Sequence, residues 1–208
     1  MCVKLNQQYF INTNFLTSVF NLKTLPKDNC TEVAFAGCSN SGKSSVINVV
    51  VQKNNLALTS KTPGRTQSIN YFQVADNKYL VDLPGYGYAK VPSQEKKKWA
   101  TLIENYLTSR HSLTGIILIM DIRHPLKEFD KQMLFFCANN QLPLYIILNK
   151  SDKLTTHQIN TTTKDVSLNI QEYNKNKIIV QPFSAIKKHG IKELQDHIIN
   201  WLDRKSLL

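Results

Sequence analysis

The stretch Gly37-Cys38-Ser39-Asn40-Ser41-Gly42-Lys43-Ser44 decides the fold. It lies between an apolar segment, Val33 to Ala36, and a helix-like one, Ser44 to Gln52, so we expect it to join a strand to a helix. The two outer glycines let the backbone curl until its N–H groups point inward, where they can bind phosphate oxygens. The helix start adds positive charge, Lys43 supplies a cation for the β and γ phosphates, and the Ser44 hydroxyl can ligate Mg²⁺. The pattern predicts a nucleotide site without specifying the base.

Apolar, β-branched runs alternate with longer amphipathic segments along the chain, which is typical of a mostly parallel sheet covered by helices. The predicted fold class is α/β, a three-layer P-loop NTPase with a six-stranded, mostly parallel sheet, one antiparallel strand and helices on both faces. Residues 1–30 are expected to form an arm packed on the domain, which spans 31–208. The predicted strands are 33–36, 67–74, 78–82, 115–121, 144–149 and 178–182, and the predicted helices are 44–52, 94–110, 126–139, 155–174 and 191–207.

The charge balance indicates a class of partner. Lys and Arg number 26 against 15 Asp and Glu, a net charge of +11. Such a field attracts polyanions, RNA or an anionic membrane surface, although a solvated lysine-rich surface has the same composition. No apolar run approaches the ~20 residues that span a bilayer, the N-terminus does not resemble a secretion signal, and the four cysteines lack C-x-x-C spacing. We therefore expect a cytoplasmic protein without a membrane span.

A guanine-binding pattern follows a later apolar strand, as Asn149-Lys150-Ser151-Asp152. Ligands of open α/β sheets bind at the carboxyl ends of strands. The Asp152 carboxylate can accept hydrogen bonds from guanine N1–H and the 2-amino group, which adenine lacks, and such sites reject the wrong ligand by ~10⁴-fold or more. Asn149 can bond the N7 edge, and the Lys150 stem can cover the ring. Further on, the backbone N–H groups of Phe183-Ser184-Ala185 can reach guanine O6, unless this segment is an ordinary β-to-α turn.

Two stretches between these motifs are candidate phosphate sensors. Asp82-Leu83-Pro84-Gly85 has the pattern D-x-x-G, whose carboxylate can hold Mg²⁺ through water and whose Gly85 N–H can bond the γ-phosphate. The loop with Gly64, Arg65, Thr66, Gln67 and Ser68 is expected to contact the nucleotide. Thr66 is our choice for the second Mg²⁺ hydroxyl, with Thr62 as its rival, and loops held in this way collapse on hydrolysis. The candidate catalytic residues are Lys43, Asn40, Thr66 and Gly85.

Taken in this order, the motifs resemble those of TRAFAC-class GTPases, which have a Ras-like fold. The local sequences 37–48, 62–67 and 82–89 resemble the EngB family in particular, with Asp121-Ile122-Arg123-His124-Pro125 as a further signature. The resemblance covers nearly the whole chain and implies an EngB-type G domain. It also implies a bacterial enzyme that hydrolyses GTP to GDP and phosphate, acts in assembly of the large ribosomal subunit with its rRNA and proteins, and is needed for normal cell division and septation. We expect this enzyme to be a monomer.

Some positions depart from familiar patterns. Cys38 and Ser41 replace the arginine and alanine common in the family, and a thiol beside a helix N-terminus is expected to be unusually acidic. Many GTPases place Gln after D-x-x-G to orient the attacking water, whereas this chain has Tyr86. Similar proteins without that Gln are slow, and some use K⁺ held by a P-loop asparagine, which Asn40 matches. We hypothesise slow hydrolysis stimulated by K⁺ or by the ribosomal partner. The alternatives are a loop hydrogen bond for Asn40 and a packing role for Tyr86.

Other readings of the sequence stay open. Glu95-Lys96-Lys97-Lys98-Trp99 fits a nucleotide-controlled RNA contact, or a solvated helix face with Trp99 in the core. A second functional hypothesis is a nucleotide-gated binding module in cell division, with hydrolysis incidental. A P-loop kinase is disfavoured, because the guanine pattern and D-x-x-G would have no purpose there.

Overall fold

The computed structural model describes residues 8–58, 68–85, 93–173 and 178–204, with the backbone alone for 93–100. The described strands form one seven-stranded sheet in the order β1-β3-β4-β2-β5-β6-β7. β4, β2, β5, β6 and β7 are parallel, and β3 runs antiparallel to both of its neighbours, β1 and β4. The strands are β1 (Asn14–Val19), β2 (Thr31–Gly37), β3 (Ile69–Ala75), β4 (Lys78–Asp82), β5 (Leu113–Asp121), β6 (Leu144–Asn149) and β7 (Ile179–Pro182).

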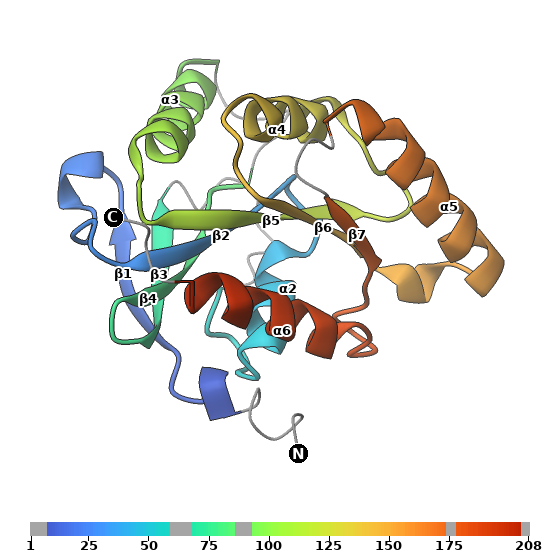
Figure 1. Ribbon diagram of the computed structural model, residues 1–208, viewed down its shortest axis with the longest axis horizontal. Coiled ribbons are helices and arrows are strands. Elements are labelled where there is room, and N and C mark those ends of the chain that lie inside the picture. Colours follow the sequence, from blue (N-terminus) through green and yellow to red (C-terminus); the bar gives the residue numbers. More distant parts are fainter. Residues whose placement is uncertain (1–7, 59–67, 86–92, 174–177, 205–208) are drawn as a thin grey trace.

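Helices cover both faces of this sheet, as Figure 1 shows. On one face lie α2 (Lys43–Val50) and α6 (Ile191–Leu202), and on the other lie α3 (Ser93–Ser109), α4 (Glu128–Asn139) and α5 (Thr156–Asn169). Short 3₁₀ helices occur at Leu22–Thr24, Ser151–Lys153 and Gln171–Tyr173. The α/β class, the mostly parallel sheet and the antiparallel pair of β3 and β4 are thus confirmed.

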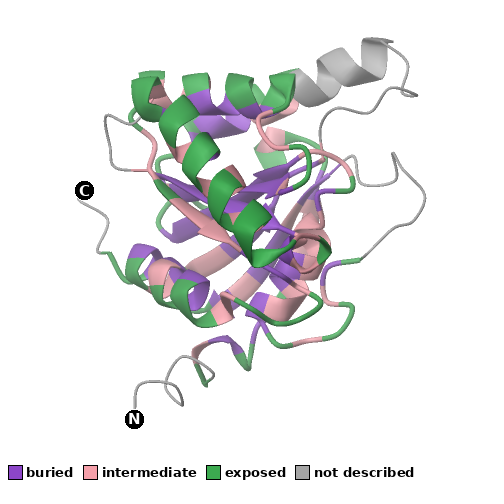
Figure 2. Ribbon diagram, turned by 90° about the vertical axis from the view of Figure 1, so that its right-hand side faces the viewer, coloured by how far each residue is buried: buried purple, intermediate pink, exposed green. Residues whose placement is uncertain are grey.

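The central strands are buried because helices lie above and below them. Every residue of β2 is buried, and alternate side chains enter two separate cores. Val33 and Phe35 pack toward α2 and α6, whereas Ala34 and Ala36 pack toward the opposite layer. Figure 2 shows buried strands between helices whose outer surfaces are exposed.

The carboxyl ends of the parallel strands β2, β5 and β6 lie side by side at the same end of the sheet. Gly37 of β2 pairs with Ile119 of β5, and Asp121 at the end of β5 pairs with Asn149 at the end of β6. This register places the loops after β2, β5 and β6 beside one another, although more than a hundred residues separate the first from the last.

The prediction of six strands was wrong, because the predicted N-terminal arm contributes a seventh. β1 pairs with β3 from Asn14 opposite Gln73 to Val19 opposite Ile69, and Phe10, just before it, is fully buried. β1 lies at the edge of the sheet with a register shift between Phe15 and Thr17, so its sequence lacks the alternation of a half-buried strand. The division of the chain at residue 31 stays a prediction.

Several predicted helices have other ends than expected. The helix predicted over 44–52 spans Lys43–Val50, and the helix predicted over 191–207 ends at Leu202. The helix predicted from Leu126 begins at Glu128, because Leu126 has φ 56°, outside the helical region. The helix predicted over 155–174 ends at Asn169. Within the described part of the chain, no helix is both long and apolar enough to cross a bilayer.

A buried carboxylate fastens the carboxyl end of α3 to β2. Glu32 is completely buried, and its Oε2 accepts hydrogen bonds from the hydroxyls of Tyr106 at 2.7 Å and Tyr71 at 3.1 Å. Arg110, the residue after α3, donates from Nε to Glu32 Oε1 at 2.9 Å and pairs with the same oxygen through Nη2. Burial, followed by the negative charge of Glu32, raises the pKa of Tyr106 well above its ordinary value. The network is therefore paired and hydrogen-bonded, as a buried charge requires.

Candidate guanine-nucleotide site

The loop from Gly37 to Ser44 joins β2 to α2 and is tightly enclosed. Gly42 has φ 93°, a left-handed conformation that favours glycine, and a Cβ there would lie 2.3 Å from Asn149 Nδ2. A Cβ on Gly37 would lie 2.5 Å from the carbonyl oxygen of Ile119. The two glycines therefore let the loop curl against the ends of β5 and β6.

The D-x-x-G segment lies against this loop. Asp82 ends β4 and pairs its carboxylate with Lys43 Nζ, and both side chains are nearly buried. A Cβ on Gly85 would lie 3.3 Å from Ser39 Oγ, so Gly85 also lies beside the loop, with Leu83 and Pro84 between. Ser44 follows Lys43 in the first turn of α2. A carboxylate and a hydroxyl are oxygen ligands of the kind that Mg²⁺ takes, and the Lys43 contact shows that the carboxylate reaches the loop, so these residues fit that ion.

Asn149, the first residue of the predicted guanine-binding pattern 149–152, connects this pattern to the loop 37–44. Its Nδ2 donates to the Ser41 carbonyl at 2.9 Å, and its Oδ1 accepts from Ala185 N–H at 3.3 Å. Asn149 is only 2% exposed, so both bonds are shielded from water. In this structure, one amide thus holds three separate segments of the chain together.

Asp152 is held by a hydroxyl that the sequence reasoning did not assign to this purpose. Ser184 Oγ donates to Asp152 Oδ1 at 2.6 Å, and this bond is the main reason why the pKa of Asp152 lies below its ordinary value. The carboxylate is therefore ionised at neutral pH, the form that accepts hydrogen bonds. Ser151, between Lys150 and Asp152, is buried and donates its N–H to the Phe183 carbonyl at 3.0 Å.

The three N–H groups predicted to reach guanine O6 have protein acceptors in this structure. Phe183 donates to the Leu148 carbonyl at 2.9 Å, and Ser184 to the His189 carbonyl at 3.2 Å. Ala185 donates to Asn149, as described above. The O6 contact through this segment stays a prediction.

Lys150, the next residue of this pattern, also contacts the loop 37–44. Its Nζ donates to the Asn40 carbonyl at 2.6 Å and to Asp121 Oδ2 at 2.9 Å. Asp121 also binds the Arg123 guanidinium through both carboxylate oxygens, at 2.9 and 2.6 Å. Burial acts to raise the pKa of Asp121, but the hydrogen bonds from Arg123 and Lys150 outweigh it, so that pKa lies well below the ordinary value.

The sequence reasoning noted Asp121 only as part of a family signature, and its contact with Lys150 was missed. One signal was available, because Asp121 ends a strand expected to lie beside the strand of Asn149, which puts the two ends at the same edge.

The expectation of an acidic Cys38 thiol was wrong. Cys38 Sγ lies 3.5 Å from Asp130 Oδ1, and Asp130 sits in the first turn of α4. Burial, assisted by the negative charge of Asp130, raises the pKa of the Cys38 thiol to about 12. Burial first, and then a carboxylate from a distant segment, thus keep the thiol protonated beside the helix start.

Several predicted site residues lie outside the described part of the chain. They are Thr62, Gly64, Arg65, Thr66, Gln67 and Tyr86, and the side chains of 95–99 are likewise not described. Ser68 is described, is buried, and donates from Oγ to Asn70 Oδ1 at 3.0 Å.

Comparisons with known proteins agree with this geometry. Residues 32–150 match the family model described as 50S ribosome-binding GTPase, and residues 100–204 match the Elongation factor Tu GTP binding domain. A probable GTP-binding protein EngB of Shigella boydii is 45% identical over 189 residues, 91% of this chain and 90% of that protein. Its counterpart in Klebsiella pneumoniae is 44% identical over 191 residues, 92% and 90% of the two chains.

Solved structures share the fold. A probable GTP-binding protein EngB has a TM-score of 0.67 at 21% identity, over 83% of this chain and 98% of its own. Aquifex aeolicus Era bound to GDP and AlF₄⁻ has a TM-score of 0.64 at 18% identity, over 85% and 58% of the chains.

Proposed function

The chain belongs to the EngB family of GTP-binding proteins, and from that premise we propose that it is a slow GTPase that times a step in assembly of the large ribosomal subunit. The observation that carries the proposal is that the guanine-binding pattern 149–152 is hydrogen-bonded to the loop 37–44. Asn149 binds Ser41 and Lys150 binds Asn40, so base and phosphates would occupy one continuous site. The family description as a 50S ribosome-binding GTPase supports the choice of partner.

Each part of the site has a distinct role in the proposal. Asp152 accepts hydrogen bonds from guanine, Lys43 and the start of α2 bind the phosphates, and the Gly85 N–H bonds the γ-phosphate. GTPases of this kind generally use Mg²⁺, which neutralises charge on the β and γ phosphates. Ser44, Thr66 and, through water, Asp82 would hold it.

Specificity for guanine is tested by competition among GTP, GDP and ATP. We expect wild type to reject ATP, and Asp152→Ala to lose the guanine preference, because the carboxylate accepts hydrogen bonds that guanine can donate and adenine cannot. Lys43→Ala should keep the preference and lose phosphate-dependent affinity. Equal affinity of wild type for ATP and GTP would refute the assignment.

Slow hydrolysis and its stimulation by K⁺ follow from Tyr86 and Asn40. Tyr86 has no amide with which to orient water. The Asn40 side chain is exposed and makes no hydrogen bond to any described residue, which leaves its oxygen available to a cation. We expect faster GTP turnover in K⁺ than in Na⁺, and loss of the difference in Asn40→Ala. Equal turnover of wild type in both salts would remove K⁺ from the proposal.

The ribosomal role is tested by co-sedimentation with large-subunit particles. We expect binding with a non-hydrolysable GTP analogue to exceed binding with GDP and to weaken with salt, because the chain carries a charge of +11. A cytoplasmic monomer needed for cell division and septation fits this role. If binding is the same in both nucleotide states, the timing role is wrong. A hydrolysis-deficient variant that still binds GTP and supports septation would favour the gated binding module.

A further inference from the structure

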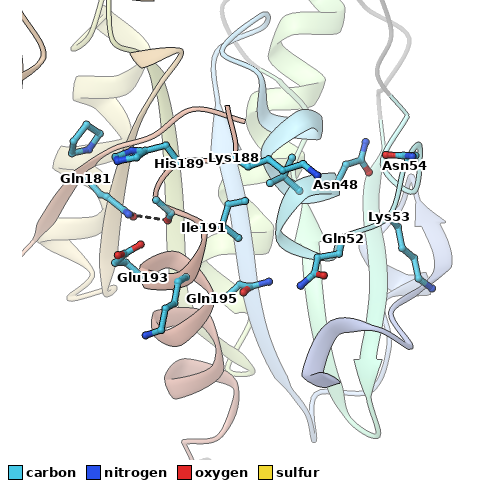
Figure 3. A pocket seen from close by; sticks show the side chains of 14 residues that line it. Asn48, Gln52, Lys53, Asn54, Gln181, Lys188, His189, Ile191, Glu193 and Gln195 are labelled. Carbon is cyan, nitrogen blue, oxygen red and sulfur yellow. Dashed lines mark hydrogen bonds between the residues drawn. The ribbon is translucent and has the colours of Figure 1, made fainter. Parts of the chain in front are cut away.

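A second cavity lies away from the nucleotide site, between α2 and α6. Its volume is ≈ 810 Å³, within the ~300–1,000 Å³ typical of ligand pockets. Figure 3 shows His189 and Gln195 on the side of α6, Gln52 and Asn54 on the side of α2, and Lys188 between them. No residue of 37–44, 82–85 or 149–152 lines it, so it is separate from the candidate nucleotide site.

The lining contains apolar and polar side chains, and its lysines outnumber its acids. Lys53 Nζ donates to the Thr13 carbonyl at 2.6 Å and to Asn14 Oδ1 at 3.3 Å, and both are neutral acceptors that leave the ammonium without an acidic partner. Lys188 is exposed and forms no ion pair within the described residues. Glu193 is the single acid among the described lining residues. A third lysine of the lining, Lys192, pairs with Asp196 at 2.9 Å and adds little. Two lysines without an acidic partner among the described residues favour an anionic ligand.

The side-chain amides of the lining indicate which class of anion fits. The side chains of Gln52 and Asn54 make no hydrogen bond to any described residue, so each offers a donor and an acceptor to the cavity. Lysines bind phosphates, and amides bind sugar hydroxyls and base edges, which is the combination that nucleic-acid contacts use. We propose that a single-stranded RNA segment binds in this cavity, with its phosphates on Lys53 and Lys188. The identification of that RNA as ribosomal rests on the proposed function.

The cavity shares its walls with the nucleotide site. α2 begins at Lys43, and Gln195 of α6 donates to the Val50 carbonyl at 2.7 Å. On the other side, Ser184, which holds Asp152, exchanges two backbone hydrogen bonds with His189 of the cavity, at 3.2 and 3.0 Å. RNA in the cavity and guanine nucleotide in its site would therefore both lie beside the loop from Ser184 to His189. Any coupling between their affinities must be reciprocal.

The test is fluorescence anisotropy of a labelled single-stranded RNA oligonucleotide, measured with GDP-bound and GTP-analogue-bound protein. The variants are Lys188→Ala alone and Lys53→Ala with Lys188→Ala. Lys131→Ala with Lys164→Ala is the matched control, because these exposed lysines lie on α4 and α5, on the other face of the sheet. Thermal unfolding of each protein verifies that the Lys53 variant remains folded.

Two lost phosphate contacts should reduce the slope of log K against log salt by about 1.4, at about 0.7 per contact on single strands. Between 50 and 200 mM salt, the wild-type affinity should then fall about sevenfold more than that of the double variant. Lys188→Ala should show about half of the change in slope, and the control none. If the cavity variants keep the wild-type slope, or if DNA of the same sequence binds as tightly as RNA, the proposal is overturned.

The two proposals can fail separately. If the cavity variants lose oligonucleotide affinity while wild type ignores large-subunit particles, the RNA site stands and the ribosomal role falls. If wild type sediments with the particles and the double variant does so with the same salt dependence, the ribosomal role stands and the cavity site is wrong.

Discussion

Replacing Asp121 by asparagine should weaken guanine-nucleotide binding, although Asp121 lies outside every motif proposed to contact the nucleotide. Asparagine keeps the shape and removes the charge. Lys150 then loses its ionic partner at 2.9 Å and keeps only the Asn40 carbonyl. A hydrogen bond to a charged group contributes about 1.5–3 kcal/mol, and the lower end applies because the Lys150 side chain is 26% exposed. The GDP dissociation constant should therefore rise about tenfold.

Fluorescent GDP titrated into wild type, Asp121→Asn, Lys150→Ala and the double variant measures this effect. On the Lys150→Ala background, Asp121→Asn should add little, because the carboxylate acts through that lysine. Arg123→Ala is the control, since it removes the exposed partner of Asp121 and leaves the Lys150 pair intact. The reasoning would be refuted if Asp121→Asn bound GDP as tightly as wild type does. It would also be refuted if Asp121→Asn lowered the GDP affinity of the Lys150→Ala protein as much as that of wild type.

Three further substitutions test contacts described above. Ser184→Ala should raise the pKa of Asp152, because it removes the hydrogen bond that is the main cause of the lowered value. On acidification, GDP binding should therefore be lost at a higher pH in this variant than in wild type. Titrations of GDP binding between neutral and acidic pH measure this. Arg110→Met leaves Glu32 buried without its cation and should lower the free energy of unfolding by about 3–5 kcal/mol in urea titrations. Adding Glu32→Gln should restore part of this stability, because it removes the unpaired charge. Gly115→Ala places a Cβ 2.5 Å from a buried tryptophan ring and should cost about 1–3 kcal/mol by thermal unfolding, and an unchanged midpoint would contradict the packing.

The sheet was predictable where burial on both faces leaves a continuous apolar run. Residues 115–121 and 144–149 have no polar interruption before their last residues, so their strand assignment needed no tertiary information. β1 was missed for the opposite reason. Phe15 and Leu16 are exposed at the sheet edge, and a strand without a buried face leaves no periodicity in the sequence.

At the candidate site, contiguous motifs were predictable and contacts between distant segments were not. The phosphate loop depends on backbone geometry, which local glycines determine. By contrast, the Ser184 bond to Asp152 and the Asp121 bond to Lys150 depend on strand register and loop conformation, which no local pattern contains. Cys38 shows the same limit, because its environment includes a carboxylate 92 residues away.

The Glu32 network has a mechanical consequence for α3. Arg110 and Tyr106 clamp the carboxyl end of this helix to the central strand, and the opposite end, at Ser93, follows the chain segment that begins at Gly85 beside the phosphate loop. Leu102 and Ile103 also pack against the core, so the carboxyl half of α3 is anchored as one unit. Substitution of Glu32 should therefore loosen this half of α3 as well as lower the stability of the domain.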